Sequence, residues 1–182
     1  MKEIDAIILP VAGTNMNGEV ESIFSNEKIF LTEEILMQTP PHCTIYSGIS
    51  NKYLSDLVKK VGRKFVLLFE RNDVAIYNSI PTVEGTLMMA IQHTDFTIHN
   101  SKTIVLGLGR VGMTVARVFA ALGAKVKVGA RKAEHLARVE EMGLTPFHLK
   151  DLETAVKNAD IVINTIPFPV VTAKVISKMP AH

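Results

Sequence analysis

The chain has 182 residues, of which 47% are hydrophobic and 21% are charged, and its formal net charge is +2. Both signs are interspersed and no basic run occurs, which argues against nucleic acid as a partner. No apolar run approaches the roughly 20 residues that span a bilayer, and no signal peptide is evident, so the pattern predicts a cytoplasmic protein without a membrane segment. The single Cys43 fits a reducing compartment, and its apolar neighbours favour a buried structural thiol over a nucleophile.

Short apolar runs alternate with helix-like stretches along the whole chain, which is typical of an α/β fold with parallel strands. In the first half we expect strands at 5–11, 43–49 and 64–70 and a helix at 51–61. A longer helix is predicted over 81–97, because Pro81 suits a first helical turn and apolar residues recur on one face.

The second half repeats the alternation and predicts one unit of a Rossmann fold. Its strands are expected at 103–107, 125–129, 146–149 and 160–164, and its helices at 112–122, 132–142, 152–157 and 171–178. The chain thus divides into a substrate-side α/β domain (1–80), a connecting helix (81–100) and a nucleotide-binding domain (101–182). We expect two Rossmann-like parallel-sheet domains, both truncated, because the chain opens almost directly into a strand and stops shortly after a helix.

A glycine-rich motif follows the strand at 103–107. Gly107, Gly109 and Gly112 form G-x-G-x-x-G, with Arg110 and Val111 between the last two. The first glycine permits a tight turn, the second lets the backbone approach a pyrophosphate, and the third lets helix and strand pack closely. The motif lies between a strand and a helix in a βαβ unit of about 30 residues, which favours a dinucleotide site over a turn without a ligand.

The next strand ends without the usual acid. A dinucleotide-binding unit commonly places a carboxylate about 20 residues past the motif, where it binds the ribose hydroxyls. This chain has Arg131 and Lys132 there. A guanidinium binds a 2′-phosphate that a carboxylate would repel, so the pattern favours NADP over NAD. The alternative is a solvated helix start, which the helix dipole disfavours for cations.

Polar residues also follow the strand at 160–164. Asn164, Thr165 and Pro167 are expected at the cofactor crevice, because the carboxyl ends of parallel strands line it. Thr165 could instead cap the following helix, and the two interpretations are equally supported.

The substrate is expected between the two domains. Ser47 and Gly48 follow a first-half strand and could bind a carboxylate, although Ser50 or Asn51 could merely cap the next helix. No spacing of His and Cys predicts a metal site.

A second polar group, Asn78, Ser79, Thr82 and Glu84, clusters at the expected start of the connecting helix. The first three are candidate substrate ligands. Glu84 is a candidate proton acceptor or only a partner of the helix dipole.

Seven runs of the sequence together resemble the dipicolinate synthase A-subunit family of spore-forming bacteria. They are 7-IILPVAGT-14, 46-YSGIS-50, 68-LFER-71, 77-YNSIPTVEGT-86, 90-AIQHTDFTIH-99, 105-VLGLGRVGMT-114 and 128-VGAR-131. The resemblance covers essentially the whole chain and implies paired Rossmann-like domains in proteins that are longer at both ends.

The resemblance also implies a function that the spacing does not show. Members of the family oxidise a dihydrodipicolinate-type dicarboxylate ring from lysine biosynthesis to dipicolinate, with NADP as hydride acceptor. Their partner is a flavoprotein-like second subunit of dipicolinate synthase, the B-subunit, and the setting is the mother cell of a sporulating bacterium. The nucleotide motif carries over onto Gly107, Gly109, Arg110 and Gly112, and the phosphate selector onto Arg131. A homo-oligomer is a further possibility. The alternatives are a 2-hydroxy-acid or shikimate-type dehydrogenase and a non-catalytic nucleotide sensor.

Overall fold

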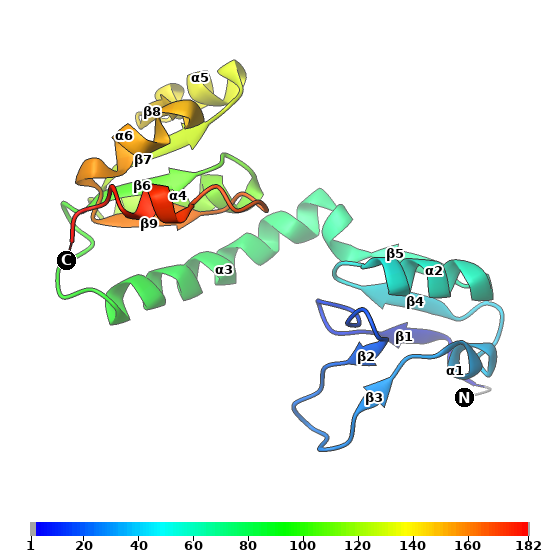
Figure 1. Ribbon diagram of the computed structural model, residues 1–182. Coiled ribbons are helices and arrows are strands. Elements are labelled where there is room, and N and C mark those ends of the chain that lie inside the picture. Colours follow the sequence, from blue (N-terminus) through cyan, green and yellow to red (C-terminus); the bar gives the residue numbers. More distant parts are fainter. Residues whose placement is uncertain (1–2, 182) are drawn as a thin grey trace. The chain divides into compact units, whose positions relative to one another are not determined.

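The computed structural model describes residues 3–181. The chain divides into two compact units, Met1–Ala75 and Ile76–His182, and α3 (Asn72–Gln92) runs through the boundary (Figure 1). We describe each unit by itself.

The first unit is built on a three-stranded parallel sheet. Its strands are β1 (Ala6–Ile8), β4 (Thr44–Ser47) and β5 (Lys64–Leu67), in the order β1-β4-β5. The helices α1 (Glu33–Met37) and α2 (Lys52–Val61) supply much of the core of this unit, which includes the fully buried Leu36, Ile45 and Leu54. The predicted strands are confirmed but shorter, and 68–70 forms a 3₁₀ turn instead of a strand end.

The helix α2 follows the expected amphipathic pattern. Leu54, Leu57, Val58 and Val61 are its buried residues. Asn51 caps its start by accepting a hydrogen bond from the Leu54 N–H, which satisfies one of the free donors of a helix end. The Asn51 cap considered from the sequence is therefore confirmed, and the buried state of Cys43 is confirmed as well.

Sequence reasoning missed a small antiparallel pair in the first unit. The strands β2 (Glu19–Val20) and β3 (Ile29–Phe30) have two residues each. Two residues are too few to show the alternation by which a strand is recognised.

The second unit contains the four-stranded parallel sheet of a Rossmann fold, which the sequence predicted. Its strands are β6 (Lys102–Leu106), β7 (Lys125–Ala130), β8 (Thr145–His148) and β9 (Ile161–Asn164), in the order β8-β7-β6-β9. Its further helices are α4 (Arg110–Ala121), α5 (Ala133–Glu141), α6 (Leu152–Ala155) and the short α7 (Ala173–Ile176).

Two cores lie against this sheet, because successive side chains of a strand point to opposite faces. Val105 packs with Phe119 of α4 and Val83 of α3 in one core. Ile104 and Leu106 pack with residues of α6 and α7 in the other. The strand β6 is thus buried from both sides, as expected for a central parallel strand.

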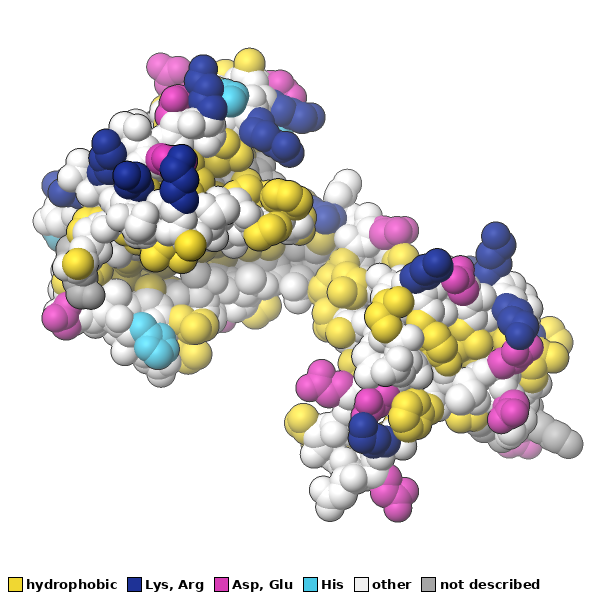
Figure 2. All heavy atoms as spheres, in the orientation of Figure 1, with side chains coloured by type: hydrophobic (Ala, Val, Ile, Leu, Met, Phe, Trp, Pro, Cys, Tyr) yellow, Lys and Arg dark blue, Asp and Glu magenta, His cyan; other side chains and the backbone are white. Residues whose placement is uncertain are grey.

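The predicted start of the long helix was wrong. The helix α3 begins at Asn72, so Pro81 lies inside it, and it ends at Gln92 instead of 97. The helix is apolar on more than one side. Val83 is buried in the core, whereas Ile76, Tyr77 and Ile80 are 50–73% exposed. Figure 2 shows such hydrophobic side chains at the surface of both units. Because α3 carries apolar residues on more than one side, it lacks the clear amphipathic period from which the start of a helix is predicted.

Replacing Pro81 by Ala should stabilise the second unit. Proline has no N–H to donate to the carbonyl of Tyr77 one turn earlier, and an interior proline costs about 3 kcal/mol relative to alanine. We expect the free energy of unfolding to rise by about 1–3 kcal/mol in denaturant titrations.

The matched control is Gly85→Ala on the same helix, where an added Cβ would meet no atom within 4 Å. That change should raise the free energy of unfolding by only about 0.5–1 kcal/mol. A Pro81→Ala gain no larger than the control gain would show that the proline imposes no strain on α3.

Candidate nucleotide-binding site

The glycine-rich loop lies at the carboxyl end of β6, and the helix α4 starts directly after it. Gly109 is the N-cap of α4 and has no side chain to satisfy the first N–H groups of the helix. Such a helix start presents backbone donors and a positive dipole end to an anion. The position fits the diphosphate of a dinucleotide.

The three glycines have three different surroundings. Gly107 has φ +96°, a left-handed conformation that side chains rarely adopt. A Cβ on Gly112 would collide with the carbonyl oxygen of Gly107, so helix and strand can approach only without a side chain there. A Cβ on Gly109 would meet nothing within 4 Å. The space over Gly109 is therefore open, as a bound pyrophosphate requires.

Thr165 braces this loop from the end of β9. Its Oγ1 donates a 2.8 Å hydrogen bond to the Leu106 carbonyl, and its backbone N–H donates to the same oxygen at 3.0 Å. The alternative of a helix cap at Thr165 was wrong, because the N-cap of α7 is Thr172. Thr165 also lines the nucleotide pocket described below.

Asn164 shapes the turn after β9. Its Nδ2 donates to the Phe168 carbonyl at 3.3 Å, and its Oδ1 accepts from the Ile166 N–H at 3.0 Å. The side-chain amide is exposed, but both its nitrogen and its oxygen form hydrogen bonds, and these hold the loop that carries Pro167.

A pocket of about 290 Å³ lies over the glycine loop and brings together six residues predicted from the sequence, namely Gly107, Gly109, Arg131, Lys132, Thr165 and Pro167. Of the other predicted cofactor residues, Arg110 and Val111 form the first turn of α4, Gly112 backs the loop, and Asn164 holds the turn beside it. None of these four lines the pocket itself.

The charge in this pocket is positive. Arg131 and Lys132 follow β7, and no Asp or Glu is among the residues that line the pocket. The carboxylate of Glu134 lies just outside it, 3.6 Å from the Lys132 ammonium. A hydrogen bond from its own backbone N–H is the main cause that lowers the pKa of Glu134, and the nearby Lys132 and His135 lower it further. The carboxylate therefore stays ionised beside Lys132.

Sequence reasoning missed five lining residues, which are Leu108, Ala130, His135, Leu149 and Ile166. Leu149 is the residue after β8, and His135 lies in the first turn of α5. The available signal was positional, because the carboxyl end of each parallel strand and the helix start after it face the ligand crevice.

The two substrate candidates in the first unit, Ser47 and Gly48, make contacts with other residues of this unit. Ser47 is fully buried, and its hydroxyl donates to the Ile49 carbonyl at 2.6 Å. A Cβ on Gly48 would meet the Val11 carbonyl oxygen at 2.7 Å. Both residues fix the packing of loops after β1 and β4, and their role in substrate binding stays a prediction.

The sequence placed the polar residues of α3 at a helix start. This prediction was wrong, because they lie inside the helix, which begins at Asn72. Thr82 donates to the Asn78 carbonyl at 2.8 Å, and Ser79 donates to the Ile76 carbonyl at 2.6 Å. Asn78 and Glu84 are exposed. Glu84 lies beyond the first turn, so its role as a partner of the helix dipole was wrong, because that effect fades within one turn. Its role as a proton acceptor stays a prediction.

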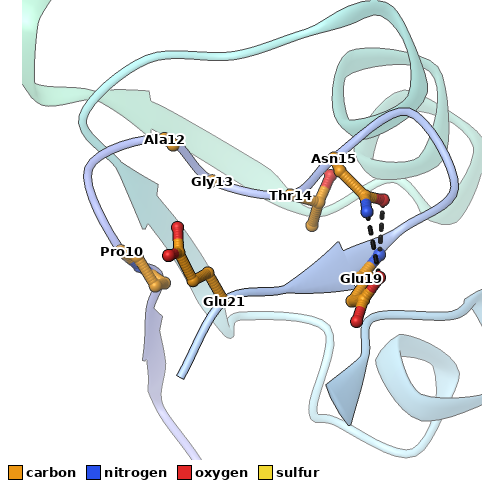
Figure 3. A pocket seen from close by; sticks show the side chains of 7 residues that line it. All are labelled: Pro10, Ala12, Gly13, Thr14, Asn15, Glu19 and Glu21. Carbon is orange, nitrogen blue, oxygen red and sulfur yellow. Dashed lines mark hydrogen bonds between the residues drawn. The ribbon is translucent and has the colours of Figure 1, made fainter. Parts of the chain in front are cut away.

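A second pocket, of about 320 Å³, lies in the first unit at the loop after β1 (Figure 3). Its lining residues are Pro10, Ala12, Gly13, Thr14, Asn15, Glu19 and Glu21. Thr14 is 5% exposed, and its Oγ1 has no hydrogen-bond partner within residues 3–181. None of the residues proposed from the sequence for substrate lines this pocket.

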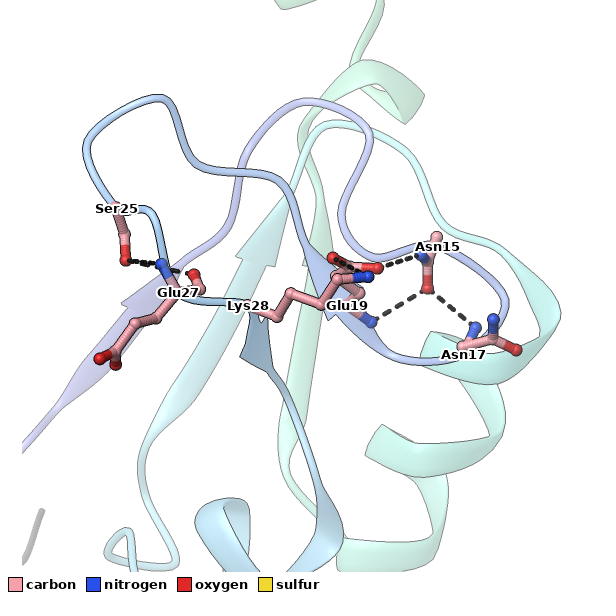
Figure 4. Close-up of polar contacts among 6 residues, drawn as sticks. All are labelled: Asn15, Asn17, Glu19, Ser25, Glu27 and Lys28. Atoms are coloured by element: carbon pink, nitrogen blue, oxygen red, sulfur yellow. Dashed lines mark hydrogen bonds and ion pairs between the residues drawn. The ribbon is translucent and has the colours of Figure 1, made fainter.

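Asn15 organises the wall of that pocket (Figure 4). Its Oδ1 accepts from the backbone N–H groups of Asn17 and Glu19, and its Nδ2 donates to the Glu19 carboxylate at 3.1 Å. Lys28 lies 3.3 Å from the same carboxylate. The charge of Glu19 is thus already balanced within the first unit.

Two kinds of site are not found in the described part of the chain. Within residues 3–181, His, Cys, Asp and Glu side chains form no cluster of three or more that could hold a metal ion. None of the helices described has the length and apolarity needed to cross a membrane.

Two family models match the chain. Residues 1–69 match the N-terminal domain of the dipicolinate synthase A-subunit, and residues 77–180 match the D-isomer specific 2-hydroxyacid dehydrogenase, NAD binding domain.

The chain is also similar to individual dipicolinate synthases. It is 60% identical over 178 residues to the dipicolinate synthase A-subunit of Bacillus subtilis, covering 98% of this chain and 60% of that protein. The crystal structure of the dipicolinate synthase A-subunit from Bacillus halodurans is 62% identical with a TM-score of 0.93, over 97% of this chain and 60% of that one. The resemblance inferred from the sequence is confirmed. The chain spans about 60% of the length of these relatives.

A more distant structure shows the fold alone. The transhydrogenase from Sinorhizobium meliloti is 13% identical with a TM-score of 0.66, over 97% of this chain and 56% of that one.

The chain belongs to the family described as D-isomer specific 2-hydroxyacid dehydrogenase, NAD binding domain, and its second unit is a dehydrogenase-type nucleotide-binding domain of Rossmann fold.

Proposed function

We propose that this chain acts as the A-subunit of dipicolinate synthase. It oxidises a ring intermediate of the lysine pathway, 4-hydroxy-tetrahydrodipicolinate, to dipicolinate with NADP as the hydride acceptor. The observation that carries the proposal is 60% identity along 98% of the chain to a protein of that name, joined to a nucleotide pocket without a carboxylate.

The choice of NADP rests on the charge at the end of β7. Arg131 lines the pocket where NAD-dependent proteins of this fold place an acid for the ribose. A guanidinium offers two parallel donors to a phosphate and remains charged at all working pH values. The 2′-phosphate of NADP is the group that uses this charge.

The chemistry requires orientation more than a strong base. Loss of water from the hydroxylated ring gives a dihydropyridine, and removal of one hydride and one proton from that ring gives the aromatic pyridine. NADP supplies the hydride acceptor when it is bound. Aromatisation makes the step downhill, so the protein has mainly to hold the two carboxylates and the reacting carbon in place.

The wider setting belongs to the same proposal. The substrate is a small dicarboxylate ring, and the flavoprotein-like B-subunit of dipicolinate synthase is the partner. The reaction takes place in the cytoplasm of the mother cell during sporulation.

The direct test is an assay of NADP reduction with the lysine-pathway intermediate, using the full chain with and without the flavoprotein-like partner. We expect NADPH and dipicolinate to appear in equal amounts, each followed by its absorbance. The family match of residues 77–180 favours 2-hydroxy acids as the rival substrate class. Reduction of NADP with a 2-hydroxy acid, and none with the ring intermediate, would contradict the proposal.

Changing Arg131 to Asp should weaken NADP much more than NAD. The change removes a charge-assisted contact and adds a repelling carboxylate, so we expect the Kd of NADP to rise by about ten- to a hundredfold in calorimetric titrations. NAD, which lacks the 2′-phosphate, should change by no more than a few-fold.

Arg138→Asp on α5 is the matched control for this charge reversal. Arg138 is exposed, pairs with Glu141 at 2.9 Å and does not line the pocket. The Arg138→Asp variant should leave the Kd of NADP and the Kd of NAD unchanged. An equal loss of NADP and NAD affinity in the Arg131 variant would show that Arg131 does not read the 2′-phosphate.

Changing Gly109 to Val should prevent binding of both dinucleotides while the second unit stays folded. The space over Gly109 is open to the protein, so a branched side chain meets no neighbour but occupies the place of the diphosphate. Titration should detect no binding at concentrations that saturate the wild type.

Gly112→Ala provides the contrasting variant. Its Cβ would collide with the Gly107 carbonyl, so this variant should lose stability, by about 1–3 kcal/mol, as overpacked sites do. Unchanged dinucleotide affinity in Gly109→Val would place the diphosphate elsewhere.

A further inference from the structure

We infer that His135, and not Lys132, is the side chain that joins Arg131 in binding the 2′-phosphate of NADP. The inference rests on the proposed use of NADP and names a specificity residue that the sequence pattern did not indicate. Arg131, Lys132 and His135 are the three side chains in the pocket that can donate hydrogen bonds to a phosphate from a basic group.

The three side chains differ in exposure. Arg131 and Lys132 are exposed, whereas His135 is half-buried in the first turn of α5. A half-buried imidazole with two side-chain torsions loses less conformational freedom on binding than an exposed lysine with four. Its contact with an anion is also less screened by solvent. His135 is therefore the better organised of the two candidates.

Lys132 lies near a carboxylate. Its ammonium lies 3.6 Å from Glu134, which stays ionised because a hydrogen bond from its own backbone N–H, and then the nearby Lys132, lower its pKa. The same carboxylate lies near His135 as well, so it does not by itself separate the two candidates. Both side chains are 68% exposed, so this ion pair is weak, and the larger difference between Lys132 and His135 is the conformational freedom that the exposed lysine would lose on binding.

The position of His135 follows from the fold. The strand β7 ends at Ala130, Arg131 follows it, and α5 begins at Ala133. The first turn of α5 thus lies next to the site of the ribose, because in this fold the ribose is held just past the end of the second strand. Leu149 and Ile166 line the same pocket with apolar surface, which suits the adenine ring.

The alternative role for His135 is contact with adenine, which NAD and NADP share. The two roles give different results. A phosphate contact affects NADP alone, whereas an adenine contact affects both dinucleotides equally.

The test is calorimetric titration of the full chain with NADP and with NAD, which needs no turnover. His135→Phe keeps a planar ring and removes the donors, and we expect the Kd of NADP to rise about three- to tenfold with NAD within about twofold. His135→Gln keeps one N–H donor and should recover most of the NADP affinity. Lys132→Ala is the matched control and should raise the Kd of NADP by less than about twofold.

Two results would overturn the inference. One is an equal loss of NAD and NADP affinity in His135→Phe, which assigns His135 to adenine. The other is a larger loss in Lys132→Ala than in His135→Phe. Failure of the proposed function looks different, because the titrations would then follow the expected pattern while the ring intermediate is not oxidised.

Discussion

The second unit depends on one close approach, between the start of α4 and the loop that follows β6. Gly112 lies so near the Gly107 carbonyl that no side chain fits between them, and Thr165 closes the same contact from β9 by its bond to Leu106. The helix start can point at a ligand only because helix and strand meet there without side chains. The hydroxyl of Thr165 thus joins the carboxyl ends of two neighbouring strands, β6 and β9, and Thr165 also lines the nucleotide pocket.

The helix α3 carries a proline, Pro81, in its interior. Its interior proline cannot donate to the Tyr77 carbonyl, and the nearby hydroxyls of Ser79 and Thr82 donate to the neighbouring carbonyls of Ile76 and Asn78. Ser79 also pairs with Thr114 of α4 at 2.8 Å, so this part of α3 is tied to the helix that carries the glycine motif.

The sequence predicted the parts of the molecule that have a strong local signature. The four strands of the second unit, the glycine turn and the arginine after β7 all follow from short patterns whose physical cause is local. The start of α3 could not be read, because Pro81 is as acceptable at a first turn as it is costly inside a helix, and tertiary packing decided between them. His135 carries no motif. Only the fold shows that the first turn of α5 reaches the pocket.

The location of the pocket separates two questions about function. Every residue that lines the nucleotide pocket, from Gly107 to Pro167, belongs to the second unit. The lining of this pocket therefore comes from a single Rossmann sheet and the helix starts after it. The pocket at Thr14 is likewise complete within the first unit. A substitution in one unit therefore leaves the lining of the other unit's pocket intact. One fold serves proteins with unrelated substrates in general because the residues of a site can change while the fold is kept.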